Sequence, residues 1–293
     1  MIFQIINSMR PKHQLKNLLI FTTLIASNSI FIGEKFYITF LSFIFFSITA
    51  GCIYIFNDLI DYNFDKKHPE KRLRPIASGK ISRKVILTFA IILLVLNLII
   101  SNLILGKSFL YILIFYITLS TLYFFYLKRI IIIDVLTLTM FYLIRIIVGS
   151  ITNEIIISQW LIVFSFFIFF SLALLKRFIE LKQNPSYKLK VKNNLSYSYL
   201  DLNLVQFLGI TSGFISSLVF VLYASSNEIQ KSFGEPKILL ANVLVLIFFV
   251  SRLWILSNRK KINFDLMNFI YKDKVSYLAG IIFVVLFISS KNF

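Results

Sequence analysis

The stretch VILTFAIILLVLNLIISNLIL, residues 85–105, contains no charged side chain and indicates the fold class by itself. A bilayer core about 30 Å thick needs roughly 20 apolar residues in an α-helix that rises about 1.5 Å per residue. Comparable runs recur along the chain, and we expect them to span the membrane at 17–33, 37–57, 85–105, 109–127, 130–150, 158–175, 204–224, 237–256 and 275–290. The sequence therefore predicts an all-α integral membrane protein with nine transmembrane helices.

The overall composition also favours a membrane protein. Hydrophobic residues make up 58% of the chain and charged residues 15%, against about half and about a quarter in soluble domains. The single cysteine, Cys52, excludes an internal disulfide. A net charge of +18 would suggest nucleic acid for a soluble protein. Here the basic residues gather between apolar runs, so we expect no nucleic-acid partner.

The distribution of basic residues predicts the orientation. Of the 31 Lys and Arg residues, 25 lie in the N-terminal segment or in connections that nine helices would place on the same side. By the positive-inside rule this side is the cytoplasm. The long polar segments 58–84, 176–203 and 257–274 share it. We therefore expect a multi-pass protein of the cytoplasmic (inner) membrane, with a cytoplasmic N-terminus and an active site that faces the cytoplasm.

Three aspartates follow the second apolar run, in the sequence Tyr54-Ile-Phe-Asn57-Asp58-Leu-Ile-Asp61-Tyr-Asn-Phe-Asp65. At about 100° per residue, Asp58, Asp61 and Asp65 fall within about 60° of one another on one helical face. Carboxylates so close repel one another unless a cation lies between them, and Mg²⁺ prefers oxygen ligands and commonly bridges to a substrate phosphate. Asn57 lies one turn and Tyr54 two turns before Asp61. The pattern predicts a Mg²⁺ site, and the alternative is an exposed acidic helix end.

Basic residues follow the aspartates directly. Lys71, Arg72 and Arg74 would supply the cations that phosphate oxygens need beyond the metal. The alternative is an ordinary cluster of positive-inside charges.

These motifs carry a resemblance to a known family. The pattern Asn57-Asp58-x-x-Asp61-x-x-x-Asp65 resembles the first aspartate motif of the UbiA-type prenyltransferase superfamily. The continuation HPEKRLRPIASG, residues 68–79, resembles the branch of decaprenyl-phosphate phosphoribosyltransferases. The resemblance implies a single UbiA-like domain over residues 1–293, with nine helices around a central cavity and a diphosphate bound through Mg²⁺.

The segment after the sixth apolar run departs from most of that superfamily. Prenyl-transferring members usually carry a second aspartate motif there, whereas this chain has Lys176-Arg177-x-x-Glu180. One carboxylate with two cations suits an additional phosphate better than a second Mg²⁺. The alternative is a helix end whose basic residues complement the helix dipole.

Two ionisable residues lie inside the fifth apolar run. Charges within a bilayer are costly and are usually paired or functional. Asp134 and Arg145 share a helical face about 16 Å apart, too far for a direct pair. By resemblance, Lys128 and Arg145 contact phosphates of the donor, Asp134 holds Lys128 or Arg129, and Lys16 lies near a substrate phosphate. A structural interhelical hydrogen bond is the alternative for Arg145.

The resemblance implies a Mg²⁺-dependent transfer of 5-phosphoribose from phosphoribosyl pyrophosphate to a polyprenyl phosphate, for cell-envelope glycan synthesis. The metal ligands would be Asn57 and the three aspartates, and membrane lipid would surround the site. One alternative is a UbiA-type prenyltransferase with a polyprenyl diphosphate donor and an aromatic or lipid acceptor; another is a transporter. Residues 186–199 fit a surface helix or a loop, and a homo-oligomer is compatible with the sequence.

Overall fold

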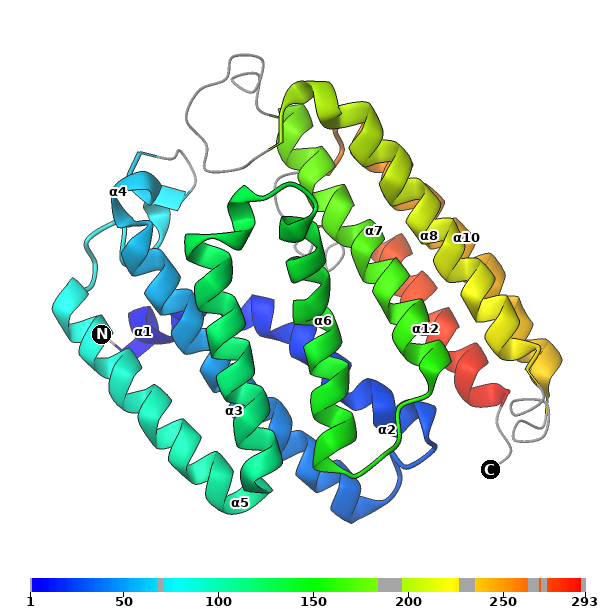
Figure 1. Cartoon of the computed structure of the whole chain (residues 1–293), viewed down its shortest axis with the longest axis horizontal. Helices are drawn as coiled ribbons and strands as arrows, with labels where there is room; N and C mark the ends of the chain where they lie inside the picture. Colours follow the sequence, from blue (N-terminus) through cyan, green and yellow to red (C-terminus); the bar gives the residue numbers. More distant parts are fainter. Residues whose placement is uncertain are drawn as a thin grey trace. The chain divides into compact units, whose positions relative to one another are not determined.

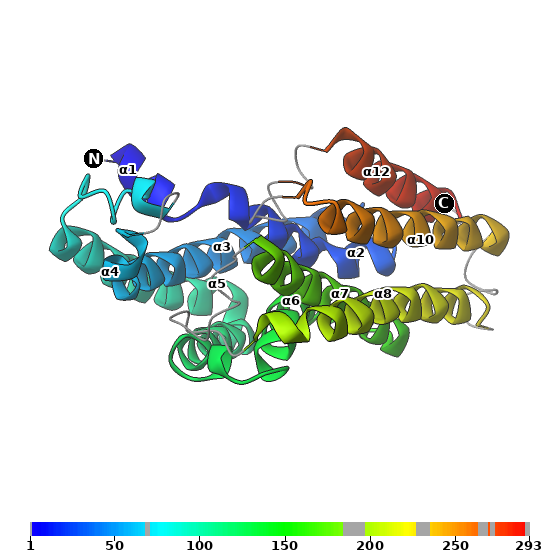
Figure 2. The ribbon, with the colours of Figure 1, turned by 90° about the horizontal axis from the view of Figure 1, so that it is seen from above.

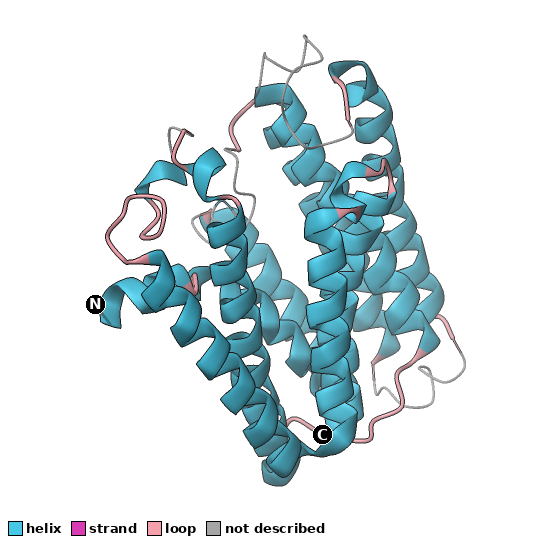
Figure 3. Cartoon of the chain, turned by 60° about the vertical axis from the view of Figure 1, so that its left-hand side comes forward, coloured by secondary structure: helices cyan, strands magenta, loops and turns pink. Residues whose placement is uncertain are grey.

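The computed structural model describes residues 2–67, 71–183, 197–226, 235–262, 269 and 273–290. His68, Asp265 and residues 186–196 lie outside the described residues. Within these ranges the chain contains helices and no strand, as Figure 3 shows. The prediction of an all-α protein is confirmed. The chain divides into two compact units, unit 1 (Met1–Leu127 and Phe141–Ile157) and unit 2 (Lys128–Met140 and Ser158–Phe293). A single domain over the whole chain stays a prediction.

Unit 1 is built on two long helices and a docked N-terminal segment (Figure 1). Its elements are α1 (Ile2–Ser8), the 3₁₀ helix η1 (Pro11–Phe21), α2 (Thr22–Ala26), α3 (Gly33–Ile60), α4 (Tyr62–Asp65), η2 (Lys71–Leu73), α5 (Arg83–Phe125) and the C-terminal part of α6 (Ile133–Thr152). Phe46, Phe109 and Leu113 are fully buried where α3 packs on α5.

Helix α5 contains two of the predicted spans, 85–105 and 109–127. It runs for 43 residues, about twice the length that a bilayer needs. Gly106 interrupts it with φ 80° and ψ 177°, a conformation that glycine adopts without steric penalty. Figure 1 shows the two halves as separate arms that meet at this bend. Both apolar runs are therefore helical.

The first predicted span, 17–33, is wrong as a continuous α-helix. The structure has η1 up to Phe21, the short α2 up to Ala26, and then a turn in which Asn28 takes a left-handed φ of 58°. Thr22, Thr23 and Ser27 explain the difference, because short polar side chains that bond nearby carbonyls compete with regular helix.

Unit 2 holds the helices of the C-terminal half. Its elements are η3 (Leu127–Arg129, starting at the boundary), the N-terminal part of α6, α7 (Gln159–Gln183), η5 (Tyr199–Asp201), α8 (Leu202–Ala224), α10 (Pro236–Asn258) and α12 (Lys274–Ser289). Figure 2 shows α10 beside α12 and α7 beside α8. The core is formed around Leu174, Phe178 and Trp254.

Six of the described helices are long and apolar enough to cross a membrane. They are Gly33–Ile60, Arg83–Phe125, Ile133–Thr152, Gln159–Lys182, Tyr199–Ala224 and Lys237–Asn258. Helix α12 is apolar but has only 16 residues. The protein is therefore a multi-pass membrane protein, whereas the count of nine spans and the cytoplasmic N-terminus stay predictions.

Candidate active site

The aspartates lie where α3 gives way to α4 in unit 1. Helix α3 ends at Ile60, Asp61 forms its C-cap, and Asp65 closes α4. The backbone bonds continue across this junction, because Asp61 N–H donates to the Asn57 carbonyl (2.9 Å) and Asp65 N–H to the Asp61 carbonyl (2.8 Å). The helical turn therefore continues from α3 into α4, and the aspartates keep the helical spacing that the sequence predicts.

Arg74 joins two of the aspartates. Its Nη1 lies 3.0 Å from Oδ1 of Asp58 and 2.5 Å from Oδ2 of Asp65. Asp58 is 3% exposed and Asp65 is 1% exposed, so both carboxylates are buried. Buried carboxylates need a cation or several hydrogen bonds to stay charged. Arg74 supplies this charge and fixes how the two side chains converge.

Arg10 brings a second guanidinium to Asp58 from the N-terminal segment. Its Nη2 contacts Oδ1 of Asp58, the oxygen that Arg74 also contacts. The guanidinium carbon of Arg10 lies 5.1 Å from the ring centroid of Tyr54, one turn before Asp58 on α3. The His13 ring lies 6.0 Å from the same ring. Tyr54 thus lines the aspartate cluster, as the sequence predicts.

The chemistry of this cluster fits a hard divalent cation. Two carboxylate oxygens converge within 3.0 Å of a single cationic nitrogen, so the backbone already brings them to one cation position. Asp61 is half-buried and its carboxylate has no partner among the described residues. In the described part of the chain no three His, Cys, Asp or Glu side chains gather as a metal-ligand group. The position between Asp58 and Asp65 holds the guanidinium group of Arg74.

The basic residues after the aspartates differ in their placement. Lys71 Nζ lies 4.0 Å from Oδ1 of Asp65, at the edge of the cluster. Arg72 is exposed. The structure therefore brings Lys71 and Arg74 to the aspartates and leaves Arg72 on the surface.

Arg145 lies in a buried polar network of unit 1. Its Nε donates to Oδ1 of Asn17 (2.7 Å), and Nη1 donates to the Phe141 carbonyl. The guanidinium carbon lies over three rings, those of Phe46 (5.2 Å), Tyr116 (5.7 Å) and Tyr142 (6.0 Å). The bond to Asn17 is an interhelical hydrogen bond of the kind that the sequence analysis gave as the alternative role of Arg145. Contact between Arg145 and a substrate phosphate stays a prediction.

Lys16 lies beside this network. Its Nζ is 5.8 Å from the ring centroid of Tyr142, the ring that also faces Arg145. The face of Tyr142 therefore stabilises two neighbouring cations. The structure thus places Lys16 and Arg145 at the same aromatic ring, a proximity that the sequence alone did not predict.

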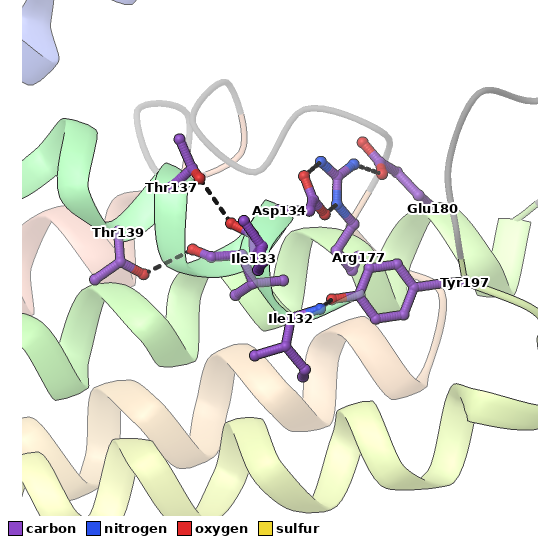
Figure 4. A network of polar contacts seen from close by, with 9 residues as sticks. Ile132, Ile133, Asp134, Thr137, Thr139, Arg177, Glu180 and Tyr197 are labelled. Atoms are coloured by element: carbon purple, nitrogen blue, oxygen red, sulfur yellow. Dashed lines mark hydrogen bonds and ion pairs between the residues drawn. The ribbon is translucent and has the colours of Figure 1, made fainter. Parts of the chain in front are cut away.

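A second charged network occupies unit 2 (Figure 4). Arg177 on α7 makes a bidentate pair with Asp134 on α6, from Nε to Oδ2 (2.6 Å) and from Nη2 to Oδ1 (2.7 Å). Its Nη1 also contacts Glu180. Asp134 is fully buried and Arg177 is 4% exposed. The sequence suggested Lys128 or Arg129 as the residue held by Asp134, and the structure adds Arg177 as a bidentate partner.

The start of α6 is held in a strained conformation. Ile132 has a φ of 67°, which is rare for a β-branched residue. Its N–H donates to the hydroxyl of Tyr197 (2.9 Å), and Figure 4 shows this bond beside the Asp134–Arg177 pair. Burial raises the pKa of Tyr197 above its ordinary value, so the phenol stays protonated. Lys128 and Lys176 lie in the same unit, half-buried.

Sequence reasoning missed Arg10 and Asn17 as site residues. Arg10 is 48 positions from Asp58, and no local periodicity connects the two. Asn17 is a buried amide at the end of the polar stretch 12–17, directly before the apolar run 18–21.

Comparison with known proteins places the chain in a family. The sequence model of the UbiA prenyltransferase family matches residues 18–192. The chain belongs to the UbiA prenyltransferase family. It is 30% identical to the uncharacterized protein y4nM of Sinorhizobium fredii, over 93% of this chain and 53% of that protein, so it spans about half the length of this relative.

Other UbiA relatives are closer in length. The chain is 30% identical to the decaprenyl-phosphate phosphoribosyltransferase of Mycolicibacterium smegmatis, over 71% of this chain and 67% of that protein. Its fold matches that of a UbiA homolog from Archaeoglobus fulgidus bound to GPP and Mg²⁺, with a TM-score of 0.68, 15% identity and 98% of each chain covered. The resemblance predicted from the aspartate loop is confirmed.

Proposed function

We propose that this UbiA protein transfers 5-phosphoribose from phosphoribosyl pyrophosphate to a polyprenyl phosphate and releases pyrophosphate. The reaction would take place at the cytoplasmic face of the inner membrane and supply a precursor of cell-envelope glycans. Relatives named decaprenyl-phosphate phosphoribosyltransferase support the donor and acceptor classes.

The aspartate cluster of unit 1 would bind the pyrophosphate end of the donor. Asn57, Asp58, Asp61 and Asp65 would hold Mg²⁺, as carboxylate and amide oxygens suit this ion. When bound, Mg²⁺ supplies positive charge that stabilises the leaving pyrophosphate. The UbiA homolog solved with GPP and Mg²⁺ supports this choice of metal.

The basic side chains would orient and neutralise the phosphates. Arg74 and Lys71 lie at the aspartates, within reach of pyrophosphate oxygens. Arg72, Lys128 and Lys176 are further predicted phosphate ligands. Lys16 and Arg145 share the ring of Tyr142 and would face the acceptor or donor phosphate from the first helical segment and α6. Charge stabilisation and positioning of this kind account for catalysis without a general base.

The transfer itself breaks the bond from ribose C1 to the pyrophosphate oxygen and forms one from C1 to an acceptor phosphate oxygen. Positive charge develops on the ribose ring as the leaving group departs. The Tyr54 ring and the aspartates stabilise such charge. The acceptor phosphate is anionic at neutral pH, so it can attack without losing a proton.

The charged residues near the end of α7 are our main reason to propose phosphoribosyl transfer rather than prenyl transfer. Most prenyl-transferring members have a second pair of aspartates there. In this chain Arg177 pairs with both Asp134 and Glu180. A guanidinium between two carboxylates opposes a second divalent cation. Glu180 and Arg177 would thus set the position of Lys176 toward a further phosphate.

The test is transfer of label in detergent-purified protein. Radiolabelled phosphoribosyl pyrophosphate, polyprenyl phosphate and Mg²⁺ are incubated together, and label is counted in the organic phase. We expect lipid-linked label that EDTA removes and that Asp61→Ala loses. Asp61 is half-buried without a described partner, so the variant should keep its fold.

A prenyltransferase is the second candidate, because the structural relative binds GPP. Transfer from a polyprenyl diphosphate to an aromatic or lipid acceptor, with no transfer from phosphoribosyl pyrophosphate, would replace our proposal with that reaction. Inactivity with both donors would favour a transporter.

A further inference from the structure

The N-terminal segment has an unusual geometry that bears on the aspartates. Helix η1 is a 3₁₀ helix of 11 residues, whereas such helices rarely exceed four. In a 3₁₀ helix every third side chain points the same way. Exposure follows this period, with Lys12, Leu15 and Leu18 exposed, and Asn17 and Ile20 buried after the half-buried Gln14. The remaining face carries Arg10 at the N-cap, His13 and Lys16.

Two glycines seat this segment directly on the helices of unit 1. A Cβ at Gly51 on α3 would lie 2.6 Å from Cε of Met9. A Cβ at Gly149 on α6 would lie 1.9 Å from the Ile20 carbonyl oxygen. Arg10 lies between these two anchored points. Its position against α3 is therefore set by close packing on both sides.

Arg10 is the less firmly bound of the two guanidinium groups on Asp58. Among the described carboxylates it pairs with Asp58 alone, whereas Arg74 bridges Asp58 and Asp65. It also takes a left-handed backbone conformation, φ 52° and ψ 65°, which is unfavourable for a side chain of this size. The two side chains are similarly exposed, 22% for Arg10 and 27% for Arg74. Of the two groups, Arg10 can change partner with the smaller loss of ion pairs.

The charges require such a change when a metal–diphosphate enters. Arg10 and Arg74 balance the two buried carboxylates, so a divalent cation meets a cluster that is already neutral. Both guanidinium groups contact the same Oδ1 of Asp58. Release of Arg10 removes one of the two cations on that oxygen and leaves a cation beside the incoming diphosphate.

We propose that Arg10 is an exchangeable counter-ion of the aspartate motif. In the ligand-free protein it neutralises Asp58. When a Mg²⁺–diphosphate binds, Arg10 yields Asp58 to the metal and donates to diphosphate oxygens. The inference rests on the proposed function only for the diphosphate class of ligand.

The test compares two affinities in detergent-purified full-length protein by calorimetry. Mg²⁺ alone is titrated first, and inorganic pyrophosphate is then titrated at saturating Mg²⁺. In Arg10→Gln, Mg²⁺ alone should bind about tenfold more tightly, because its competitor is gone. Pyrophosphate should bind at least about tenfold more weakly, because one charge-assisted hydrogen bond is lost. A merely structural role would not move the two affinities in opposite directions.

Lys12→Gln is the matched control, since Lys12 is an exposed cation on the outer face of the same helix. Both affinities should stay at wild-type values in this variant. Arg10→Lys keeps the charge and should restore the Mg²⁺ affinity to near wild type. Equal or weaker Mg²⁺ binding in Arg10→Gln, or unchanged pyrophosphate binding, would overturn the inference.

Hydrogen–deuterium exchange gives a test that needs no variant. Addition of Mg²⁺ and pyrophosphate to the wild type should change exchange at residues 9–13 and leave residues 33–36, at the far end of α3, unchanged. If the protein binds pyrophosphate but hydrogen–deuterium exchange at residues 9–13 does not change, the proposed change of partner by Arg10 is wrong and the proposed function is unaffected. Failure of the wild type to bind Mg²⁺–pyrophosphate would overturn it together with the proposed function.

Discussion

Replacing Arg177 by Met should destabilise unit 2 strongly. The substitution keeps most of the side-chain volume but removes the cation that holds Asp134 and Glu180. Asp134 is fully buried and would be left charged without its bidentate partner. Breaking one partner of a buried ion pair typically costs about 3–5 kcal/mol. We expect a loss of this size in the free energy of unfolding.

The double variant Asp134→Leu/Arg177→Met should recover most of that stability. It removes both Asp134 and Arg177, and replacing both members of a buried ion pair by apolar residues often leaves the stability unchanged. Unfolding in mixed detergent micelles can be followed by tryptophan fluorescence, because both tryptophans, Trp160 and Trp254, lie in unit 2. Trp254 packs on Phe178, the neighbour of Arg177, with ring centroids 5.5 Å apart.

Arg259→Met is the control for this pair. Arg259 is exposed at the end of α10, so its replacement should change the unfolding free energy by no more than about 0.5 kcal/mol. A loss below about 1 kcal/mol in Arg177→Met would show that the pair contributes little. A double variant as unstable as the sum of both single variants would refute the coupling.

Three further outcomes are expected. Gly149→Ala should cost about 1–3 kcal/mol because its methyl group would meet the docked N-terminal segment, while Gly280→Ala, with open space around it, should be neutral or slightly stabilising; thermal unfolding of both variants checks this. Tyr197→Phe should cost about 1–3 kcal/mol, because the partly buried N–H of Ile132 loses its acceptor, and equal unfolding midpoints for variant and wild type would contradict it. Asp273 is the N-cap residue of α12, and Arg252 on α10 donates to its carboxylate (2.9 Å). This hydrogen bond lowers the pKa of Asp273 from 3.8 to about 2. Its stabilisation is therefore present above about pH 4 and is lost as the pH falls toward 2, so unfolding midpoints should drop over this window and drop less in Asp273→Asn.

The helical class and most helix positions could be predicted because lipid allows few solutions. Long apolar runs such as 85–105 must form helices in a membrane, and the structure has helices there. The segment 17–33 was predicted less well. Its polar residues satisfy their own backbone, so average hydrophobicity did not reveal the 3₁₀ helix that begins at Pro11.

The site divides in the same way. Asp58 and Asp65 could be brought together from their spacing, because both follow one helix. The partners that neutralise them could not, since Arg10 and Arg74 reach them through tertiary packing. Asp134 and Arg177 are 43 positions apart on different helices, and a single sequence does not show that such residues are in contact.

The three faces of η1 make the length of the N-terminal segment as important as its composition. Each residue of a 3₁₀ helix turns the chain by about 120°, so 11 residues rise about 22 Å rather than the 16 Å of an α-helix. Removing or inserting one residue would rotate every later position onto the next face. The buried amide of Asn17 would then exchange places with an exposed or a basic side chain. Natural variation in this segment should accept substitutions at positions such as Lys12 and Leu15 but reject single-residue insertions and deletions.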